Sequence, residues 1–240
     1  MGIRSATAEP RFLDFYTRHG LEHALTAYGY LPLLRRLGFQ GLQIQLEPGG
    51  PPDRMQITAQ LQGKRAILVD LSVSIRTLDP WKTLYVEWLE LQDPRLSFTA
   101  SRPRLPGQQR PGLGLAEETM TLLLRASERL ELDGVSFVPA HYHVAWMSRG
   151  RFVVLDPRAR GRLAALVDLL EGVPLIRASQ LLDDPGLTCL DGTILRWDPP
   201  EMVAPGTEAL ADWLHETKAE AEAARAELAA LLPPRDTLWS

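Results

Sequence analysis

Strict alternation of apolar and polar residues across residues 55–62 constrains the fold of this chain more than any other feature. Every odd position is apolar and every even position is a glutamine or threonine, which is the two-residue period of a strand with one buried face. Gly63-Lys64 then supplies a tight turn, so residues 66–77 are predicted to pair back as a hairpin. The chain must therefore contain an antiparallel sheet.

Elements on either side of the hairpin follow from periodicity and from glycine and proline positions. The further strands are predicted at residues 41–46, 84–92, 96–102, 135–138 and 151–155. The helices are predicted at residues 10–28, 31–37, 115–132, 160–170, 175–182 and 207–232, with a helical turn through residue 147. Residues 183–205 are rich in Gly, Asp and Pro and are expected to be irregular.

This order predicts a mixed α/β (α+β) fold with a largely antiparallel sheet flanked by helices. Residues 1–157 would form the α/β domain with its N-terminal helices, and residues 158–240 a helical extension. The inward positions of the tail helix keep a 4-3 spacing, but alanines fill its middle, whereas a coiled-coil seam would need larger residues. We therefore expect a helix that packs on its own domain or on a neighbouring subunit.

Charge and cysteine content limit the functional classes. A net charge of −4 argues against general nucleic-acid binding, and the excess of arginine over lysine is typical of GC-rich coding and favours a bacterial source. A single cysteine, Cys189, excludes an internal disulfide and suits a reducing compartment. The N-terminus lacks an apolar signal core, and no apolar run approaches the roughly 20 residues of a membrane span. We expect a soluble cytoplasmic protein without membrane contact.

A glycine-rich turn, Gln-Arg-Pro-Gly-Leu-Gly at residues 109–114, leads directly into the predicted helix 115–132. Such a turn leaves backbone N–H groups uncovered at a helix N-terminus, where they commonly bind phosphate. The alternative is a structural turn that packs the helix closely on the sheet.

The turn and its setting resemble the GNAT N-acetyltransferase superfamily, whose members bind the pyrophosphate of acetyl-CoA with a Gln/Arg-x-x-Gly-x-Gly/Ala turn. The resemblance covers residues 55–155, and residues 105–114 match at the level of the motif. It implies acetyl-CoA or another acyl-CoA as cofactor, with the backbone N–H groups of Gly112, Leu113 and Gly114 on the pyrophosphate. Gln109 and Arg110 would flank it.

The resemblance also implies an N-acyltransferase acting on an amine whose identity the sequence leaves open. The alternative is a non-catalytic module of the same architecture, which would use its C-terminal helix for assembly, for instance as a homo-oligomer. Glu117 and Glu118, which repel an anion from the first helical turn, favour this alternative. So does Arg149, which stands where the family carries a tyrosine.

Two glutamates on one predicted strand are candidates for the general base that acyl transfer to an amine needs. Glu87 and Glu90 lie among apolar residues of the strand 84–92, a setting that raises the pKa of a carboxyl group. Being three residues apart, they are expected to face opposite sides of the sheet. Each could instead be an ordinary solvent-facing glutamate.

The segment His141-Tyr142-His143 follows the end of a predicted strand, a common location for functional residues. His143 could act as a base and Tyr142 as a proton donor, although a tyrosine there is more often a packing residue. Two histidines without a suitably spaced carboxylate or cysteine are weak evidence for a metal, so no metal site is expected.

Overall fold

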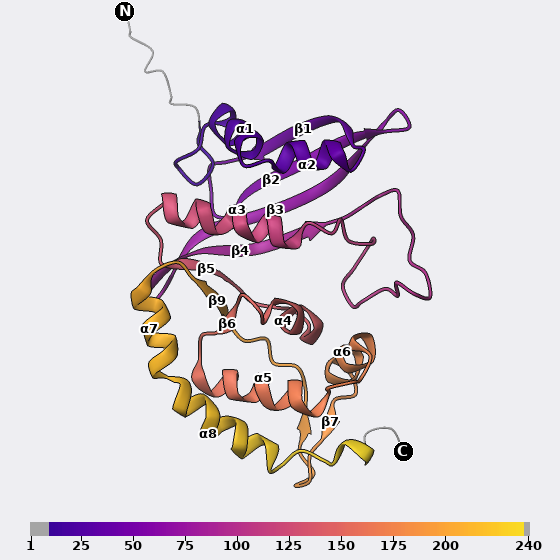
Figure 1. Ribbon diagram of the computed structural model, residues 1–240, viewed down its shortest axis with the longest axis vertical. Helices are drawn as coiled ribbons and strands as arrows, with labels where there is room; N and C mark the ends of the chain where they lie inside the picture. The colour runs from indigo at the N-terminus through magenta and orange to yellow at the C-terminus, as the bar shows by residue number, and fades with distance from the viewer. Residues whose placement is uncertain (1–9, 238–240) are drawn as a thin grey trace, which may run out of the picture.

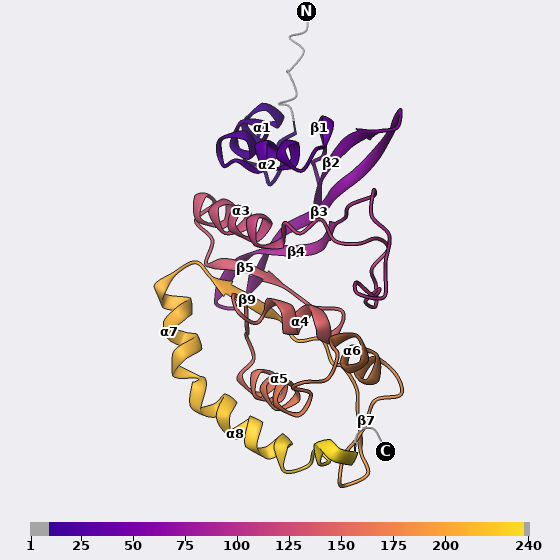
Figure 2. The ribbon, with the colours of Figure 1, turned by 45° about the vertical axis from the view of Figure 1, so that its right-hand side comes forward.

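A computed structural model describes residues 10–237 (Figures 1 and 2), so the N-terminal residues expected to lack a signal core lie outside the described range. In that range the chain forms eight α-helices, nine strands and one short 3-10 helix, Arg235–Thr237. The strands are β1 (Gln40–Glu47), β2 (Asp53–Leu61), β3 (Lys64–Leu78), β4 (Trp81–Leu91), β5 (Gly134–Phe137), β6 (Val153–Val154), β7 (Leu187–Thr188), β8 (Ile194–Leu195) and β9 (Met202–Pro205). The helices are α1 (Arg18–Ala27), α2 (Tyr30–Arg36), α3 (Ala116–Arg129), α4 (Tyr142–Ser148), α5 (Pro157–Leu169), α6 (Leu175–Asp183), α7 (Glu208–Glu216) and α8 (Lys218–Ala229).

Seven of these strands form one sheet in the order β1-β2-β3-β4-β5-β9-β6. Neighbouring strands are antiparallel except β4 and β5, which are parallel and are connected through α3. The predicted mixed fold with a largely antiparallel sheet and flanking helices is thus confirmed. The predicted hairpin is confirmed as β2 and β3, whose turn residues Gln62 and Gly63 both have positive φ (+48° and +77°), as a tight type I′ turn requires.

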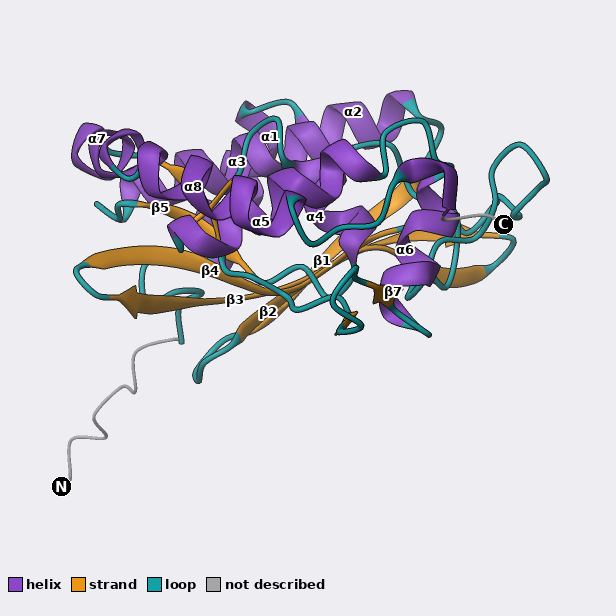
Figure 3. Cartoon of the chain, turned by 90° about the horizontal axis from the view of Figure 1, so that it is seen from below, coloured by secondary structure: helices purple, strands orange, loops and turns teal. Residues whose placement is uncertain are grey.

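Helices α1, α2 and α3 cover one face of strands β1 to β4 (Figure 3). In the described chain a helix meets the other face only at its end, where Trp213 of α7 contacts Trp81 of β4. Apolar residues at alternate strand positions, including Ile57, Val69, Leu71 and Leu84, are buried under the helices. The opposite positions on β3 carry polar residues. We call this second side of β1 to β4 the open face.

The helix predicted at residues 10–28 begins only at Arg18, and the strand predicted at residues 96–102 is wrong. Residues 10–17 do not begin a helix, because the Leu13 N–H donates to the buried carboxylate of Asp53 and Leu13 and Asp14 adopt positive φ of 54°. Residues 96–102 do not form a strand and contain only an isolated bridge between Thr99 and Arg102. Prolines at 103 and 106 prevent regular pairing beyond that bridge.

Strand β9 was not expected, because it lies in the Gly/Asp/Pro-rich stretch. It inserts between β5 and β6, so the sheet draws on both of the chain segments proposed as separate parts, 1–157 and 158–240. Helix α7 packs on β9 through a second apolar cluster, in which Val203, Leu210 and Leu214 are buried.

The predicted tail helix is divided at Thr217, whose hydroxyl donates to the carbonyl of Trp213 at 3.0 Å. Helix α8 lies along α5 (Figure 1). Gly161 of α5 makes the close approach possible, since a Cβ atom there would lie 2.2 Å from the carbonyl oxygen of Ala221. The apolar side of α8 is therefore engaged within the chain, as one of the two sequence interpretations expected. None of the helices formed by residues 10–237 is both long and apolar enough to cross a bilayer.

Candidate functional site

The two parallel strands separate shortly after they meet. β4 and β5 are paired only from Thr83–Gly134 to Tyr85–Ser136. Immediately beyond Tyr85, the register between β3 and β4 shifts at Glu87, which has no partner residue on β3. Such a bulge bends its strand and ends regular pairing. The edge of β4 that faces β5 therefore continues beyond Tyr85 without β5 as a partner.

The glycine turn is attached to the far end of the same strand. The Leu113 N–H donates to the Leu91 carbonyl at 3.2 Å, and the Asp93 N–H donates to the Pro111 carbonyl at 2.9 Å. Of the three N–H groups expected to bind pyrophosphate, that of Leu113 is thus already engaged. In the described chain, the N–H groups of Gly112 and Gly114 have no partner.

The two glycines of the turn differ in what the fold requires of them. Gly114 has a φ of +78°, a conformation that a side chain disfavours. Gly112 has no such φ, and a Cβ atom there would meet only the Leu91 carbonyl oxygen, at 3.8 Å. Backbone conformation therefore accounts for glycine at 114, whereas neither conformation nor packing requires it at 112, where the missing side chain leaves the backbone open to an approaching molecule.

Helix α3 begins at this turn without a side-chain cap, so the N–H groups of its first turn stay directed outward. The carboxylate of Glu117, expected to repel an anion, forms an ion pair with Arg151 at 2.9 Å. Arg104 bonds the carbonyl of Gln108 at 2.6 Å and the side chain of Gln109 at 3.5 Å. Arg110 is exposed beside them, so positive charge gathers around the turn.

A polar cluster occupies the open face where β4 and β5 separate. We call Arg76, Tyr85, Glu87, Ser136 and Glu201 the junction cluster. The Arg76 guanidinium lies 3.4 Å from the centre of the Tyr85 ring and 3.3 Å from Glu87 Oε1. The hydroxyl of Ser74 on β3 donates to the same Glu87 oxygen at 2.9 Å.

Of the junction cluster, sequence reasoning singled out only Glu87, and it missed the carboxylate of Glu201. Its Oε1 atom is buried, and the described chain offers that atom no hydrogen-bond partner. Burial raises the pKa of Glu201, and the nearby Glu87 raises it further, while Ser136 and Arg76 act in the opposite direction. In the sequence, Glu201 stands out only as a carboxylate directly before the short apolar run 202–204.

The structure corrects the expected orientation of the two strand glutamates. The bulge at Glu87 changes the alternation along β4, so the Glu87 side chain contacts β3 side chains of the open face. Glu90 lies directly opposite Asp70 of β3 in the strand register, on that same face. Glu87 and Glu90 therefore do not face opposite sides. Burial, followed by the charge of Asp70, raises the pKa of Glu90.

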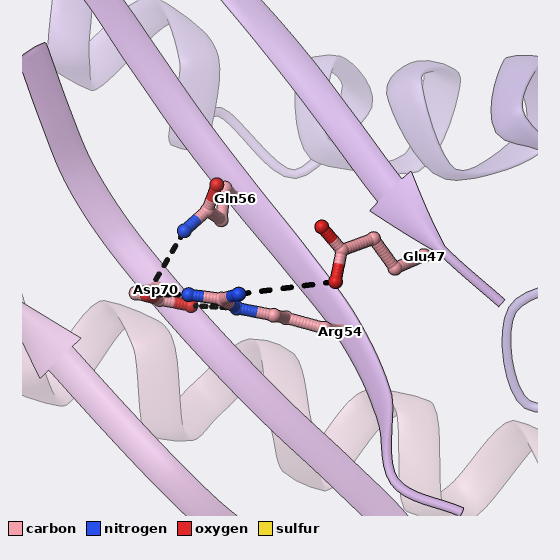
Figure 4. A network of polar contacts seen from close by, with 4 residues as sticks. All are labelled: Glu47, Arg54, Gln56 and Asp70. Atoms are coloured by element: carbon pink, nitrogen blue, oxygen red, sulfur yellow. Dashed lines mark hydrogen bonds and ion pairs between the residues drawn. The ribbon is translucent and has the colours of Figure 1, made fainter. Parts of the chain in front are cut away.

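Asp70 is held in a network across three strands (Figure 4). Arg54 binds both of its carboxylate oxygens, at 2.8 and 2.6 Å, and Gln56 donates to it at 2.9 Å. Glu47 lies on the other side of Arg54 at 3.8 Å. Hydrogen bonds from Arg54 lower the pKa of Asp70, so this network stabilises the open face next to Glu90.

The histidine segment lies close to the loop that precedes the glycine turn. A Cβ atom at Gly107 would lie 3.1 Å from His141 Nε2, and His141 Nδ1 is 3.0 Å from the carboxylate of Asp183. His143 stacks on His141 with a centroid separation of 5.5 Å. Its Nδ1 is 3.0 Å from the Ser179 hydroxyl.

The three residues of this segment differ in how far they are buried. His143 is buried, and burial together with His141 lowers its pKa to about 4, so it is neutral at pH 7. Tyr142 is buried in the main core edge-on to Trp197, and burial raises its pKa to about 12. His141, half-buried and oriented by Asp183, is thus the member with a ring nitrogen directed toward the glycine loop.

In the described chain, no group of three or more His, Cys, Asp or Glu side chains is arranged to hold a metal ion. Comparison with protein-family models gives no match, and comparisons with curated proteins and with solved structures give none either.

Proposed function

We propose that this protein is an acyl-CoA-dependent N-acyltransferase that acts on an amine. The observation that carries the proposal is the separation of the parallel strands β4 and β5 beyond Tyr85–Ser136. The glycine turn lies at one end of the strand edge that β5 leaves unpaired, and the junction cluster lies at the other. Carboxyl ends of parallel strands are common ligand sites in α/β proteins.

The edge of β4 that β5 leaves unpaired is long enough for the pantetheine arm of the cofactor. Six residues separate Tyr85 from Leu91, which at roughly 3.3 Å per residue is about 20 Å. An extended pantetheine arm has a comparable length, and its amide groups can bond a strand edge in the manner of an added strand. With the pyrophosphate at the turn, the thioester would lie near the junction cluster.

The turn provides the charge complementarity that a pyrophosphate needs. The N-terminus of α3 carries about half a positive elementary charge, and Arg110 adds to it. Gly112 leaves its backbone N–H accessible, and Arg151 offsets the charge of Glu117. Gly112, Gly114 and the first turn of α3 would hold the diphosphate.

The junction cluster supports the chemistry of transfer. The amine nitrogen attacks the thioester carbonyl carbon, the carbon–sulfur bond breaks, and the thiolate leaves with the electron pair and takes up a proton. Glu201, with its raised pKa and unpartnered oxygen, would accept the proton that the amine loses. Glu87 is held by Arg76 beside it, and Glu90 lies further along the strand.

The test combines binding with thiol release. Gly112→Asp places a negative charge in the turn at a position where a Cβ atom meets only the Leu91 carbonyl oxygen, at 3.8 Å, so CoA binding should weaken at least tenfold while the melting temperature is unchanged. Ala219→Asp, which adds the same charge to the first turn of α8, is the matched control and should bind as wild type. Glu201→Gln should retain CoA binding but lose CoA release from acetyl-CoA in a screen of amines. Equal binding by Gly112→Asp and wild type would contradict the proposal.

The second candidate, a non-catalytic module, is favoured by the engagement of the Leu113 N–H in the fold. Assembly through the C-terminal helix has less support, because α8 packs on α5 of the same chain. Light scattering, which gives the oligomeric state, together with a CoA titration distinguishes the two. A monomer that binds CoA fits the acyltransferase, whereas an oligomer without CoA affinity fits the module.

A further inference from the structure

A second site lies on the helix-covered side of the sheet, away from the glycine turn. A partly open apolar cavity of about 70 Å³ lies between α1, α3 and strands β2 to β4. It lies beneath the middle and C-terminal half of α3, whereas the glycine turn precedes the N-terminus of that helix. Its walls include Leu25, Met55, Val69, Leu84 and Leu123.

The interior of the cavity is suited to a hydrocarbon chain and not to water. The hydroxyls of Tyr30 and Thr119 in the lining satisfy each other, since they are 2.8 Å apart and Thr119 also donates to the Leu115 carbonyl at 2.7 Å. The other polar side chains of the lining, Tyr16, Tyr28, Arg125 and Arg129, contact one another. A water molecule needs two to four polar partners, which these walls do not offer. An apolar cavity of this kind stays dry and binds apolar groups.

The rim of the cavity carries positive charge. Arg125 and Arg129, one turn apart on α3, are exposed, and both lie over the ring of Tyr28, at 4.5 and 5.5 Å from its centre. Within the described chain, neither arginine forms an ion pair with a carboxylate. Two guanidinium groups that have no carboxylate partner in the described chain, beside an apolar cavity, form a complementary site for an anionic head on an aliphatic tail.

We propose that this cavity binds a short fatty acid, with the chain inside and the carboxylate on Arg125 and Arg129. Because a water-sized group needs roughly 10–15 Å³ of such volume, the cavity accommodates a chain of about five to seven carbons. The inference is independent of acyl transfer, since it uses neither the glycine turn nor the junction cluster.

Calorimetric titration of the full-length protein with butanoate, hexanoate, octanoate and decanoate tests the proposal. Affinity should rise about fourfold per added methylene, the equivalent of roughly 0.8 kcal/mol, and should stop rising once the chain exceeds the cavity, at about eight carbons. Hexan-1-ol, which lacks the charge, should bind at least tenfold more weakly than hexanoate. Equal affinity for the alcohol, or a rise that continues through decanoate, would overturn the assignment.

Two variants locate the binding. Arg125→Gln/Arg129→Gln should weaken hexanoate at least tenfold, while the control Arg35→Gln/Arg36→Gln, which changes the same charge on α2, should bind as wild type. Ala126, which lines the cavity, gains three carbons in Ala126→Leu, so the best chain should shorten by about that number. An unchanged chain preference in Ala126→Leu would refute binding inside the cavity.

Discussion

Replacing Gly161 by alanine tests whether α8 packs on α5 as closely as the structure indicates. A Cβ atom at 161 would lie 2.2 Å from the Ala221 carbonyl oxygen, 2.6 Å from the Arg225 nitrogen and 2.9 Å from Ala224 Cβ. Such atoms do not normally approach within about 3 Å, so the helices must separate by roughly 1 Å. Two of these contacts are with backbone atoms, which have no rotamer to change.

The expected cost follows from two opposing effects. Overpacking of a tight contact costs about 1–3 kcal/mol and sometimes more, whereas alanine gains up to about 1 kcal/mol over glycine in a helix interior. Because the new Cβ atom clashes with backbone atoms of α8, we expect a net loss of about 2 kcal/mol, which lowers the melting temperature by roughly 4–8 °C in a chain of this size.

Thermal unfolding followed by circular dichroism measures this effect. Gly150→Ala is the control, since a Cβ atom at 150 meets nothing within 4 Å, and it should unfold within about 2 °C of wild type. If Gly161→Ala is as stable as wild type or more stable, helix propensity outweighs the contact, and α8 does not lie against α5 as described.

Three further predictions concern polar groups. Glu201 has a raised pKa when folded, so its contribution to stability is complete below its unfolded pKa and is lost as pH rises through the folded value. The melting temperature of Glu201→Gln should therefore gain on that of wild type as pH rises above the unfolded pKa, and a difference that does not change with pH would contradict the burial of this carboxyl. Tyr30→Phe removes the hydroxyl that is 2.8 Å from Thr119 and should cost about 1 kcal/mol in urea unfolding, while no loss would indicate that the bond contributes nothing. Asp70 has a lowered pKa because Arg54 hydrogen-bonds its carboxylate, so Asp70→Asn should destabilise by about 1 kcal/mol at pH 7. This difference should shrink as pH falls through the folded pKa of Asp70, and a difference that does not change with pH would exclude the ion pair with Arg54 as its cause.

The sequence was sufficient for elements whose pattern is long and regular. The hairpin of β2 and β3 follows from eight alternating residues and one turn, and α3 follows from an amphipathic stretch bounded by glycines. The glycine turn was placed correctly at the N-terminus of that helix. In each case the local pattern and the tertiary packing favour the same structure.

The elements that the sequence did not reveal depend on contacts distant along the chain. Strand β9 has only four residues and is stabilised by β5 and β6 on either side, so its own pattern is too short to predict a strand. The bulge at Glu87 arises from the register with β3, and it places Glu87 and Glu90 on one face against simple alternation. Glu201 joins the junction cluster only because β9 inserts beside β5.

Thermal unfolding of the wild-type protein with and without CoA tests the central claim most directly. At 100 times the dissociation constant, a ligand bound only by the folded state adds about 2.7 kcal/mol of stability, which corresponds to a rise of roughly 5–10 °C in melting temperature. The account predicts such a rise with CoA and its loss in Gly112→Asp. An unchanged melting temperature at millimolar CoA would contradict an acyl-CoA site at the glycine turn.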